Sequence, residues 1–210
     1  MRIALIGAGG LAKEYLEVAQ LNGHEIVATF SSSGSLAGIP NLGYLDDISA
    51  NKDKFDAVAI AIGVNNIERI QVRRTILDFL NEHNIKQANL ISPFSRIHSS
   101  VILGEGVYIH HDVIISCDAQ IGNGVIINTS AKIGHDCRIG DNVSVGPNVF
   151  IGGGAVIGDD ILLGVASVIR DGIEIGSNSV VGMGAVVVKS MKENQLMMQQ
   201  ITKAISISFN

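Results

Sequence analysis

Tryptophan is absent from the 210-residue sequence, aromatic residues make up only 4% of it, and it contains two cysteines. With 47% hydrophobic residues and 24 glycines, the core must be aliphatic, which suits stacked aliphatic ladders better than an aromatic-centred sandwich. We expect Cys117 and Cys137 to be reduced, buried small residues, because they occupy different positions of the repeat described below.

The sequence also lacks any run of Lys or Arg, and its formal net charge is -5. Nucleic acid and anionic membranes are therefore not expected as partners. The apolar run at residues 3–6 breaks into glycines at once and is too short for a signal peptide or a membrane span, which predicts a cytoplasmic protein. Since domains usually contain roughly 100–200 residues, the length favours two small domains.

The first half of the sequence alternates β-branched, aliphatic runs with helical patterns. The predicted strands are residues 3–6, 25–30 and 57–62. Helical patterns follow the first and third strands, through residue 19 and over residues 65–81. This alternation indicates a Rossmann-like βαβ domain with a parallel sheet, whose ligand site lies at the carboxyl ends of the strands.

Glycines follow the first predicted strand in the segment Gly7-x-Gly9-x-x-Ala12. Missing side chains let a phosphate approach backbone N–H groups at the positive N-terminus of a helix, as in the dinucleotide fingerprint. That fingerprint also requires an acidic residue after the second strand, where this chain has serines at 31–33. We therefore favour a nucleotide diphosphate attached to a sugar over NAD as the ligand. The alternative that the glycines only form a tight strand-to-helix turn remains open. The predicted substrate contacts are Gly9, Gly10, Leu11, Ser31, Ser32 and Gly63.

An aliphatic residue recurs at every sixth position of the second half, from Ile97 to Val187, without exception or insertion. Glycine follows it in most repeats, and a small or β-branched residue stands four positions after it. This period is typical of a parallel β-helix with three six-residue faces per coil, and the repeats predict about five coils. We divide the chain into the βαβ domain at residues 1–92, the β-helix at residues 93–192 and a tail at residues 193–210, with a short helix from Glu193 to Ala204.

Two segments resemble a known family: Gly7-Ala-Gly-Gly-Leu-Ala-Lys-Glu and Asn128-Thr-Ser-Ala-Lys-Ile-Gly-His135-Asp136-Cys-Arg-Ile-Gly-Asp. Together they resemble the bacterial sugar acetyltransferases that modify sialic acid or UDP-linked 4-amino sugars, over residues 1–191. The resemblance implies a left-handed β-helix, acetyl-CoA as donor and a homotrimer with active sites between subunits. It implies N-acetylation of a nucleotide-linked amino sugar for surface glycan synthesis, with O-acetylation of sialic acid or another sugar as the alternative.

His135 is the predicted catalytic base. Acetyl transfer from a thioester needs a group that takes a proton from the attacking amine or hydroxyl, and histidine suits this role near neutral pH. His135 stands at the outward third position of its hexad, and Asp136 follows directly, where a carboxylate fixes the imidazole tautomer. Gly153, one coil later, leaves a groove for a pantetheine arm and an N–H for the thioester oxygen. A solvated surface histidine is the structural alternative.

The donor is expected to contact Ser144, Gly153, Val165 and Met183, and no metal is expected. Ser144 stands nine residues after the base, where relatives often have a second histidine, and its hydroxyl can donate a similar hydrogen bond. Two further departures from the family leave other contacts open. The serines at 31–33 replace an acidic pair that grips the nucleotide in UDP-sugar enzymes, and the usual Val-x-Gly-x-Pro-Ala ending, near the adenine end of CoA, is absent.

The remaining histidines of the β-helix are expected to be polar surface residues. His98 starts the helix, and His110 and His111 share no face with His135 because their offsets are not multiples of eighteen. A zinc-dependent carbonic anhydrase on this helix needs three convergent histidines, which the spacing does not provide. In a non-catalytic scaffold we would expect bulky side chains to close the groove, whereas this chain has glycines at 152–154. Apolar residues expected to point outward support a trimer: Ala119, Ile126, Val156, Val168 and Val180.

Overall fold

The computed structural model describes residues 1–199 and opens with a parallel three-stranded sheet in the order β2-β1-β3. The elements in chain order are β1 (Arg2–Ala8), α1 (Gly10–Leu21), β2 (Glu25–Gly34), the 3₁₀ helices η1 (Leu45–Asp47) and η2 (Ser49–Lys54), β3 (Ala57–Ile60) and α2 (Ile67–Glu82). The aliphatic β1 is central and almost fully buried. The predicted βαβ arrangement is therefore confirmed.

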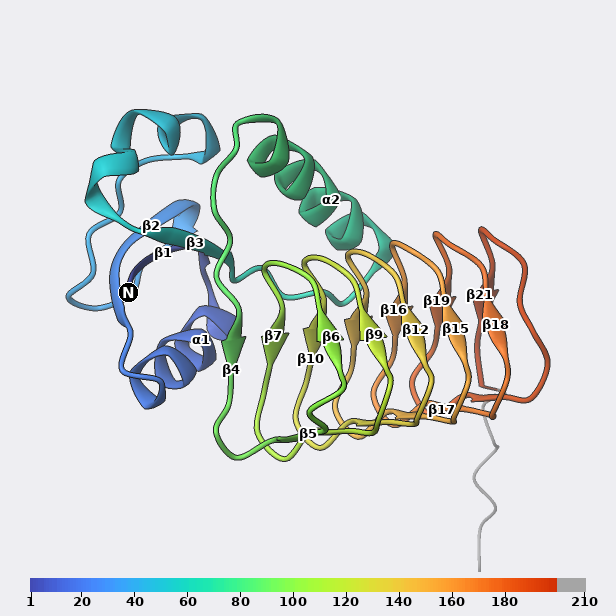
Figure 1. Cartoon of the computed structure of the whole chain (residues 1–210). Helices are drawn as coiled ribbons and strands as arrows, with labels where there is room; N and C mark the ends of the chain where they lie inside the picture. The colour runs from blue at the N-terminus through green and yellow to red at the C-terminus, as the bar shows by residue number, and fades with distance from the viewer. Residues whose placement is uncertain (200–210) are drawn as a thin grey trace, which may run out of the picture.

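A β-helix follows, in which every strand is two residues long and three parallel sheets form the faces (Figure 1). Face 1 contains β4 (Leu90–Ile91), β7 (Tyr108–Ile109), β10 (Ile126–Ile127), β13 (Ser144–Val145), β16 (Leu162–Leu163), β19 (Val180–Val181) and β21 (Leu196–Met197). Face 2 contains β5 (Arg96–Ile97), β8 (Ile114–Ile115), β11 (Lys132–Ile133), β14 (Phe150–Ile151), β17 (Val168–Ile169) and β20 (Val186–Val187). Face 3 contains β6 (Ile102–Leu103), β9 (Gln120–Ile121), β12 (Arg138–Ile139), β15 (Val156–Ile157) and β18 (Glu174–Ile175).

The interior of the β-helix is an aliphatic core. The residue at every sixth position is the second residue of its strand and packs inside, and so does the residue four positions later, such as Val125 or Cys137. Equivalent residues of successive coils pair in register, as Ile127 does with Val145. Because a fully buried aliphatic side chain contributes about 1.5–3 kcal/mol, these ladders hold the coils together.

Positive φ angles recur at the fourth position of the repeat. Asp136, Asn142, Asn148 and Asp160 have φ angles of 58°, 57°, 56° and 58°, and Gly154 has 69°. Gly, Asn and Asp tolerate this left-handed conformation best, which explains why they recur with the period of the turns. The left-handed backbone conformation therefore explains an aspartate at position 136 independently of any catalytic role.

The residues expected to point outward divide into two groups. Val156 and Val168 are each 37% exposed, and Val180 is half-buried. The expectation is wrong for Ala119, which stands at the inward fifth position of its hexad and packs in the core. It is also wrong for Ile126, because the N-terminal domain covers that part of face 1.

The β-helix has about six coils, one more than expected, because it extends at both ends beyond the repeats counted from Ile97 to Val187. β4 lies within residues 1–92 and pairs with β7, and β21 lies within residues 193–210 and pairs with β19. The helix expected from Glu193 to Ala204 is wrong for its described part, where β21 extends face 1, and residues 200–204 lie outside the described residues. Val181 pairs with Met197, sixteen rather than eighteen residues later, so counting by six misses this strand.

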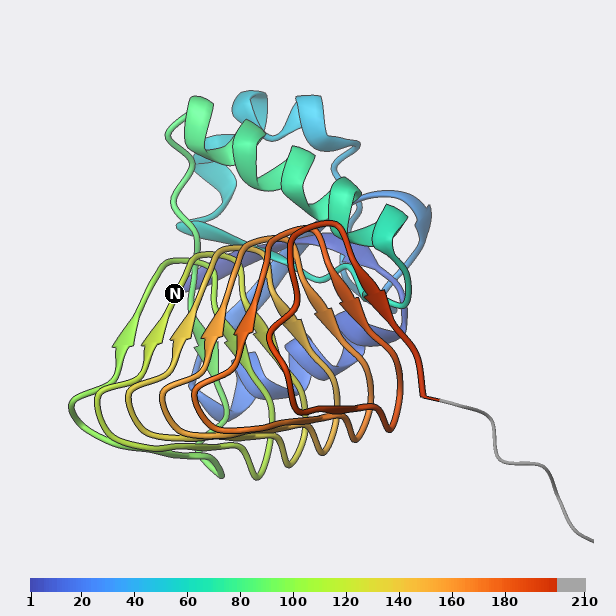
Figure 2. The same ribbon diagram turned by 90° about the vertical axis from the view of Figure 1, so that its right-hand side faces the viewer.

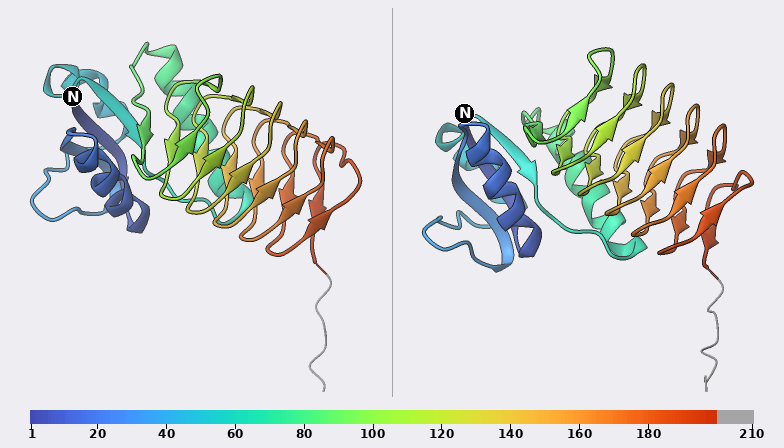
Figure 3. Two further views of the ribbon diagram at one scale, coloured as in Figure 1. Left: turned by 60° about the horizontal axis from the view of Figure 1, so that its bottom comes forward. Right: turned by 90° about the horizontal axis from the view of Figure 1, so that it is seen from below.

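The N-terminal domain packs on face 1 at the first coils. Tyr15 of α1 stacks on Tyr108 of β7 with ring centroids 3.8 Å apart. α2 lies along the corner that leads from face 3 to face 1, where the Asn142 amide donates to the Ile70 carbonyl (Figure 2). Both views of Figure 3 show the N-terminal sheet at the first-coil end. Among residues 1–199, no helix has the length and apolar character needed to cross a membrane.

Candidate active site

His135 and Asp136 lie on the turn that leads from β11 on face 2 to β12 on face 3. His135 Nδ1 is 2.7 Å from Asp136 Oδ2, and both side chains are 65% exposed. When Nδ1–H donates to the carboxylate, the lone pair stands on Nε2, which is the tautomer that proton abstraction requires. The two side chains have the geometry of an oriented general base on an open corner.

Gly153 lies one coil after His135 on the same corner and faces its ring. A Cβ built on Gly153 would lie 2.6 Å from His135 Nε2, so glycine alone leaves the ring in this position. The Gly153 N–H donates no hydrogen bond within the described chain, whereas its carbonyl accepts one from the Gly172 N–H. An unpaired N–H beside the base is able to hold a developing oxyanion.

The other three expected donor contacts lie away from His135 within one chain. Ser144 is on face 1 and only 4% exposed, because nine residues are half a coil and lead to a different side of the β-helix. Val165 and Met183 are 42% and 73% exposed on the corner that leads from face 1 to face 2. The structure therefore brings none of these three residues to the catalytic corner of the same chain.

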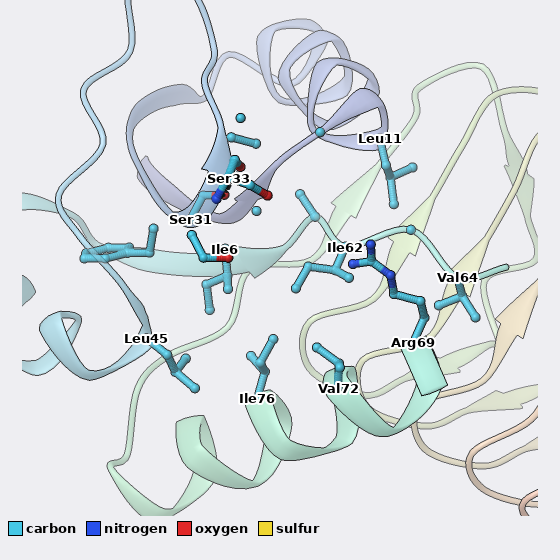
Figure 4. A pocket seen from close by; sticks show the side chains of 18 of the residues that line it. Ile6, Leu11, Ser31, Ser33, Leu45, Ile62, Val64, Arg69, Val72 and Ile76 are labelled. Carbon is cyan, nitrogen blue, oxygen red and sulfur yellow. Dashed lines mark hydrogen bonds between the residues drawn. The ribbon is translucent and has the colours of Figure 1, made fainter. Parts of the chain in front are cut away.

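A pocket of about 800 Å³ opens at the carboxyl ends of the N-terminal strands (Figure 4). It is lined by the turn after β1, the end of β2, the segment after β3 and the first turns of α2. The six residues expected to contact substrate all line it: Gly9, Gly10, Leu11, Ser31, Ser32 and Gly63. The convergence expected of a parallel sheet is confirmed at this edge.

The first turn of α1 offers unpaired N–H groups to the pocket. α1 begins at Gly10, and no side chain caps it at Gly9. A Cβ on either glycine would meet nothing within 4 Å, so the space in front of these N–H groups is open. Gly7 differs, because its φ is 106° and a Cβ there would lie 2.9 Å from the Ala61 carbonyl oxygen. Gly7 is thus required by the turn, whereas Gly9 and Gly10 keep the helix N-terminus accessible to an anion.

Among residues 1–199, Arg69 is the only charged residue that lines the pocket. It extends from the first turn of α2 on the same side as Leu11 and Val64, across from Ser31 (Figure 4). The sequence analysis missed Arg69, because only the packing of α2 beside the glycine turn reveals its place. At the opposite side, the Asn41 amide donates to the Ser31 carbonyl at 2.9 Å and fixes the end of β2.

His110 and His111 are not the polar surface residues that the sequence predicts. His110 is 9% exposed, its Nδ1 accepts the His111 N–H at 2.8 Å, and burial lowers its pKa. The Nε2 atoms of the two rings lie 3.6 Å from carboxylate oxygens of Glu14 and Glu17 on α1, a helix whose position the repeat does not reveal. His98 is exposed, as predicted. In the described part of the chain, no group of three or more His, Cys, Asp or Glu residues is placed to hold a metal.

Three protein-family models match successive parts of the chain. Residues 2–76 match the PglD N-terminal domain, residues 118–153 match the bacterial transferase hexapeptide (six repeats), and residues 154–189 match the hexapeptide repeat of succinyl-transferase. A comparison with curated proteins gives no match. The family models thus identify both the N-terminal domain and the β-helix.

Solved structures resemble the chain along nearly its whole length. A mutant of perosamine N-acetyltransferase from Caulobacter crescentus, in complex with CoA and GDP-perosamine, is 31% identical, with a TM-score of 0.84 over 93% of this chain and 92% of that one. The acetyltransferase domain of PglB from Neisseria gonorrhoeae FA1090, in complex with acetyl coenzyme A, is 26% identical, with a TM-score of 0.83 over 92% and 93%. WeeI from Acinetobacter baumannii AYE is 28% identical, with a TM-score of 0.78 over 93% and 95%. The chain therefore belongs to the bacterial sugar acetyltransferases built on a left-handed β-helix of hexapeptide repeats, and it is an acyltransferase rather than a scaffold.

Proposed function

We propose that this enzyme transfers the acetyl group of acetyl-CoA to the amino group of a nucleotide-linked amino sugar. The observation that carries the proposal is the N-terminal pocket, where the N-terminus of α1 and Arg69 form a cationic site for a diphosphate. The relatives support both substrates, since the Caulobacter enzyme holds CoA and GDP-perosamine and PglB holds acetyl coenzyme A. Acetyl-CoA and nucleotide sugars are cytoplasmic metabolites, so the proposed reaction belongs in the cytoplasm.

A diphosphate fits the charge of the pocket better than a neutral sugar does. An anion near the N-terminus of a helix gains about 0.3–1 kcal/mol, and an arginine adds two parallel donors to phosphate oxygens. No acidic residue of the described part of the chain lines the pocket, although the whole chain has a net charge of -5. The serines at 31–33 are neutral, so the end of β2 does not repel the phosphates.

In the proposed reaction, the sugar amine attacks the thioester carbonyl while His135 Nε2 takes its proton. A C–N bond forms, the C–S bond breaks, and the CoA thiolate takes the proton from the imidazolium as it leaves. Asp136 accepts the Nδ1–H and stabilises the imidazolium. The Gly153 N–H donates to the oxyanion, a type of contact whose removal costs about 10²–10³ in turnover.

The proposal includes a homotrimer, which face 2 supports. Its outward residues include the apolar side chains of Phe150, Val168 and Val186, which are 44%, 37% and 59% exposed. A continuous apolar stripe of this kind marks an interaction site, and closed cyclic symmetry covers it.

A seam at face 2 also accounts for the expected donor contacts. Face 2 lies between the corner of His135 and the corner of Val165 and Met183. A neighbouring chain packed on this face brings its own corner toward His135. We therefore retain Val165 and Met183 as donor contacts across the seam, whereas Ser144 is buried on face 1.

Light scattering should give about three times the 22.1 kDa mass of one chain. Phe150→Glu places a charge in the apolar stripe of face 2 and should convert the trimer to single chains without activity. Val156→Glu on face 3 is the matched control, because its side chain is also exposed, and it should leave the mass unchanged. A wild-type mass equal to one chain would contradict both the trimer and the shared site.

Release of CoA measured against a panel of acceptors tests the proposed function. We expect turnover with nucleotide-linked amino sugars and none with the same amino sugars lacking the nucleotide. Arg69→Met should raise the KM for the nucleotide sugar about tenfold, the scale of one lost hydrogen-bonding contact to a charged group. Arg2→Met is the control, because Arg2 starts β1 at the end of the sheet opposite the pocket and pairs with Asp56. Equal turnover of free sialic acid would replace the proposal by O-acetylation.

A further inference from the structure

Arg73 of α2 is a buried cation without an acidic partner. It is 1% exposed and forms no salt bridge with any of residues 1–199. Its guanidinium instead donates to three backbone carbonyls and lies beside the Tyr15 hydroxyl. Burying a charge that has only neutral hydrogen-bond acceptors costs free energy. The burial of Arg73 therefore calls for a specific role.

The three carbonyls belong to two separate parts of the molecule. Arg73 Nη1 donates to the Ile60 carbonyl at 2.9 Å and to the Ile62 carbonyl at 3.3 Å, and Ile62 lines the N-terminal pocket. Nη2 donates to the Gly124 carbonyl at 2.6 Å, on the β-helix corner between β9 and β10. One planar group thus connects the pocket wall to the β-helix that carries His135.

The two sides of α2 match this division. Arg69 and Ile76 line the pocket. Arg73 and Leu77 face the β-helix, and a Cβ on Gly124 would lie 2.6 Å from Leu77 Cδ1, so this approach is close. α2 is therefore packed between the pocket and the β-helix, and Arg73 is its hydrogen-bonded link to both.

We infer that Arg73 is a positioning residue that holds the acceptor pocket in a fixed place on the β-helix. The inference rests on the proposed function, because it takes the pocket as the acceptor site. A guanidinium presents its donors as a rigid planar fork, whereas an ammonium is a point charge that cannot span both sides. Without the fork, the segment after β3 is no longer held, and the acceptor is bound less well. The proposed donor contact, Gly153, lies on another corner and should keep its geometry.

Arg73→Lys tests this role, with Arg74→Lys as the matched control. Arg74 Nε donates to Asp160 Oδ1 at 2.9 Å, so it also ties α2 to the β-helix but reaches no part of the pocket wall. We expect Arg73→Lys to raise the KM for a nucleotide-linked amino sugar about tenfold, as for loss of a charged hydrogen bond, and to leave the KM for acetyl-CoA within about twofold. Arg74→Lys should change neither KM by more than about twofold, since lysine keeps the charge beside Asp160 and this half-buried pair touches no part of the pocket wall.

Hydrogen exchange of residues 60–66 gives a readout that needs no acceptor. Exchange should be about tenfold faster in Arg73→Lys than in the wild type or Arg74→Lys, because local opening follows the loss of the fork. Tyr15→Phe, which removes only the hydroxyl beside the guanidinium, is a milder variant and should change both readouts in the same direction.

Unchanged exchange in residues 60–66 overturns the inference, and so does an equal rise of both KM values, which marks a general loss of structure. If the wild type acetylates no nucleotide-linked amino sugar, the proposed function fails. The exchange result then still decides whether Arg73 holds the pocket wall.

Discussion

Replacing His135 with alanine should lower turnover by about 100-fold or more, because general base catalysis typically contributes 10²–10⁴. The side chain is 65% exposed and belongs to no core cluster, so the fold should stay intact. The measurement is the rate of CoA release at saturating acetyl-CoA and acceptor. Circular dichroism and particle mass, compared with the wild type, separate a catalytic loss from a structural one.

His98→Ala is the control for this variant, since His98 is an exposed histidine at another turn of the same β-helix. It should turn over at the wild-type rate. Wild-type turnover by His135→Ala would remove His135 from the mechanism and leave the corner with a surface histidine, the structural alternative that its exposure alone suggests.

The β-helix could be predicted from the sequence because its geometry repeats. An inward side chain at every sixth position must stack on its equivalent one coil away, so the spacing alone places Ile127 against Val145. The C-terminal end of the β-helix could not be predicted in this way. Ile91 of β4 keeps the regular spacing, since it pairs with Ile109 eighteen residues later, whereas Met197 of β21 pairs with Val181 only sixteen residues away.

Two parts of the candidate site could be predicted: residues separated by a whole coil of the β-helix, and residues at the carboxyl ends of neighbouring parallel strands. Gly153 stands eighteen residues after His135 and faces its ring for that reason. The serines of β2 and the glycine turn meet because the strands are parallel. Ser144 could not be placed correctly, because an offset of half a coil leads to another face. Arg69 was missed because the docking of α2 depends on tertiary contacts that no repeat encodes.

Gly153→Ala should reduce turnover nearly as much as the loss of His135 itself. The added Cβ would lie 2.6 Å from His135 Nε2, below any normal contact distance, and the ring, which is 65% exposed, has room to rotate whereas the backbone is held in the coil. The ring must therefore swing away from the position in which Nε2 meets the attacking amine. Catalytic geometry tolerates little displacement, and a shift of about 1 Å can cost 10²-fold in rate. Alanine keeps the N–H of residue 153, so this variant tests the ring position rather than the oxyanion contact.

A double-mutant cycle separates this mechanism from general damage to the corner. If the Cβ acts by displacing the ring, Gly153→Ala should have almost no further effect once His135 is alanine, since two groups that act as a unit are not additive. The CoA-release rates of the wild type, both single variants and the double variant decide the matter. Losses that multiply would mean that residue 153 acts on the donor independently of His135. Cys117→Ala is the control, because Cys117 stands one coil before His135 on the same corner. It should turn over at the wild-type rate, since this small change forces no side chain into the imidazole.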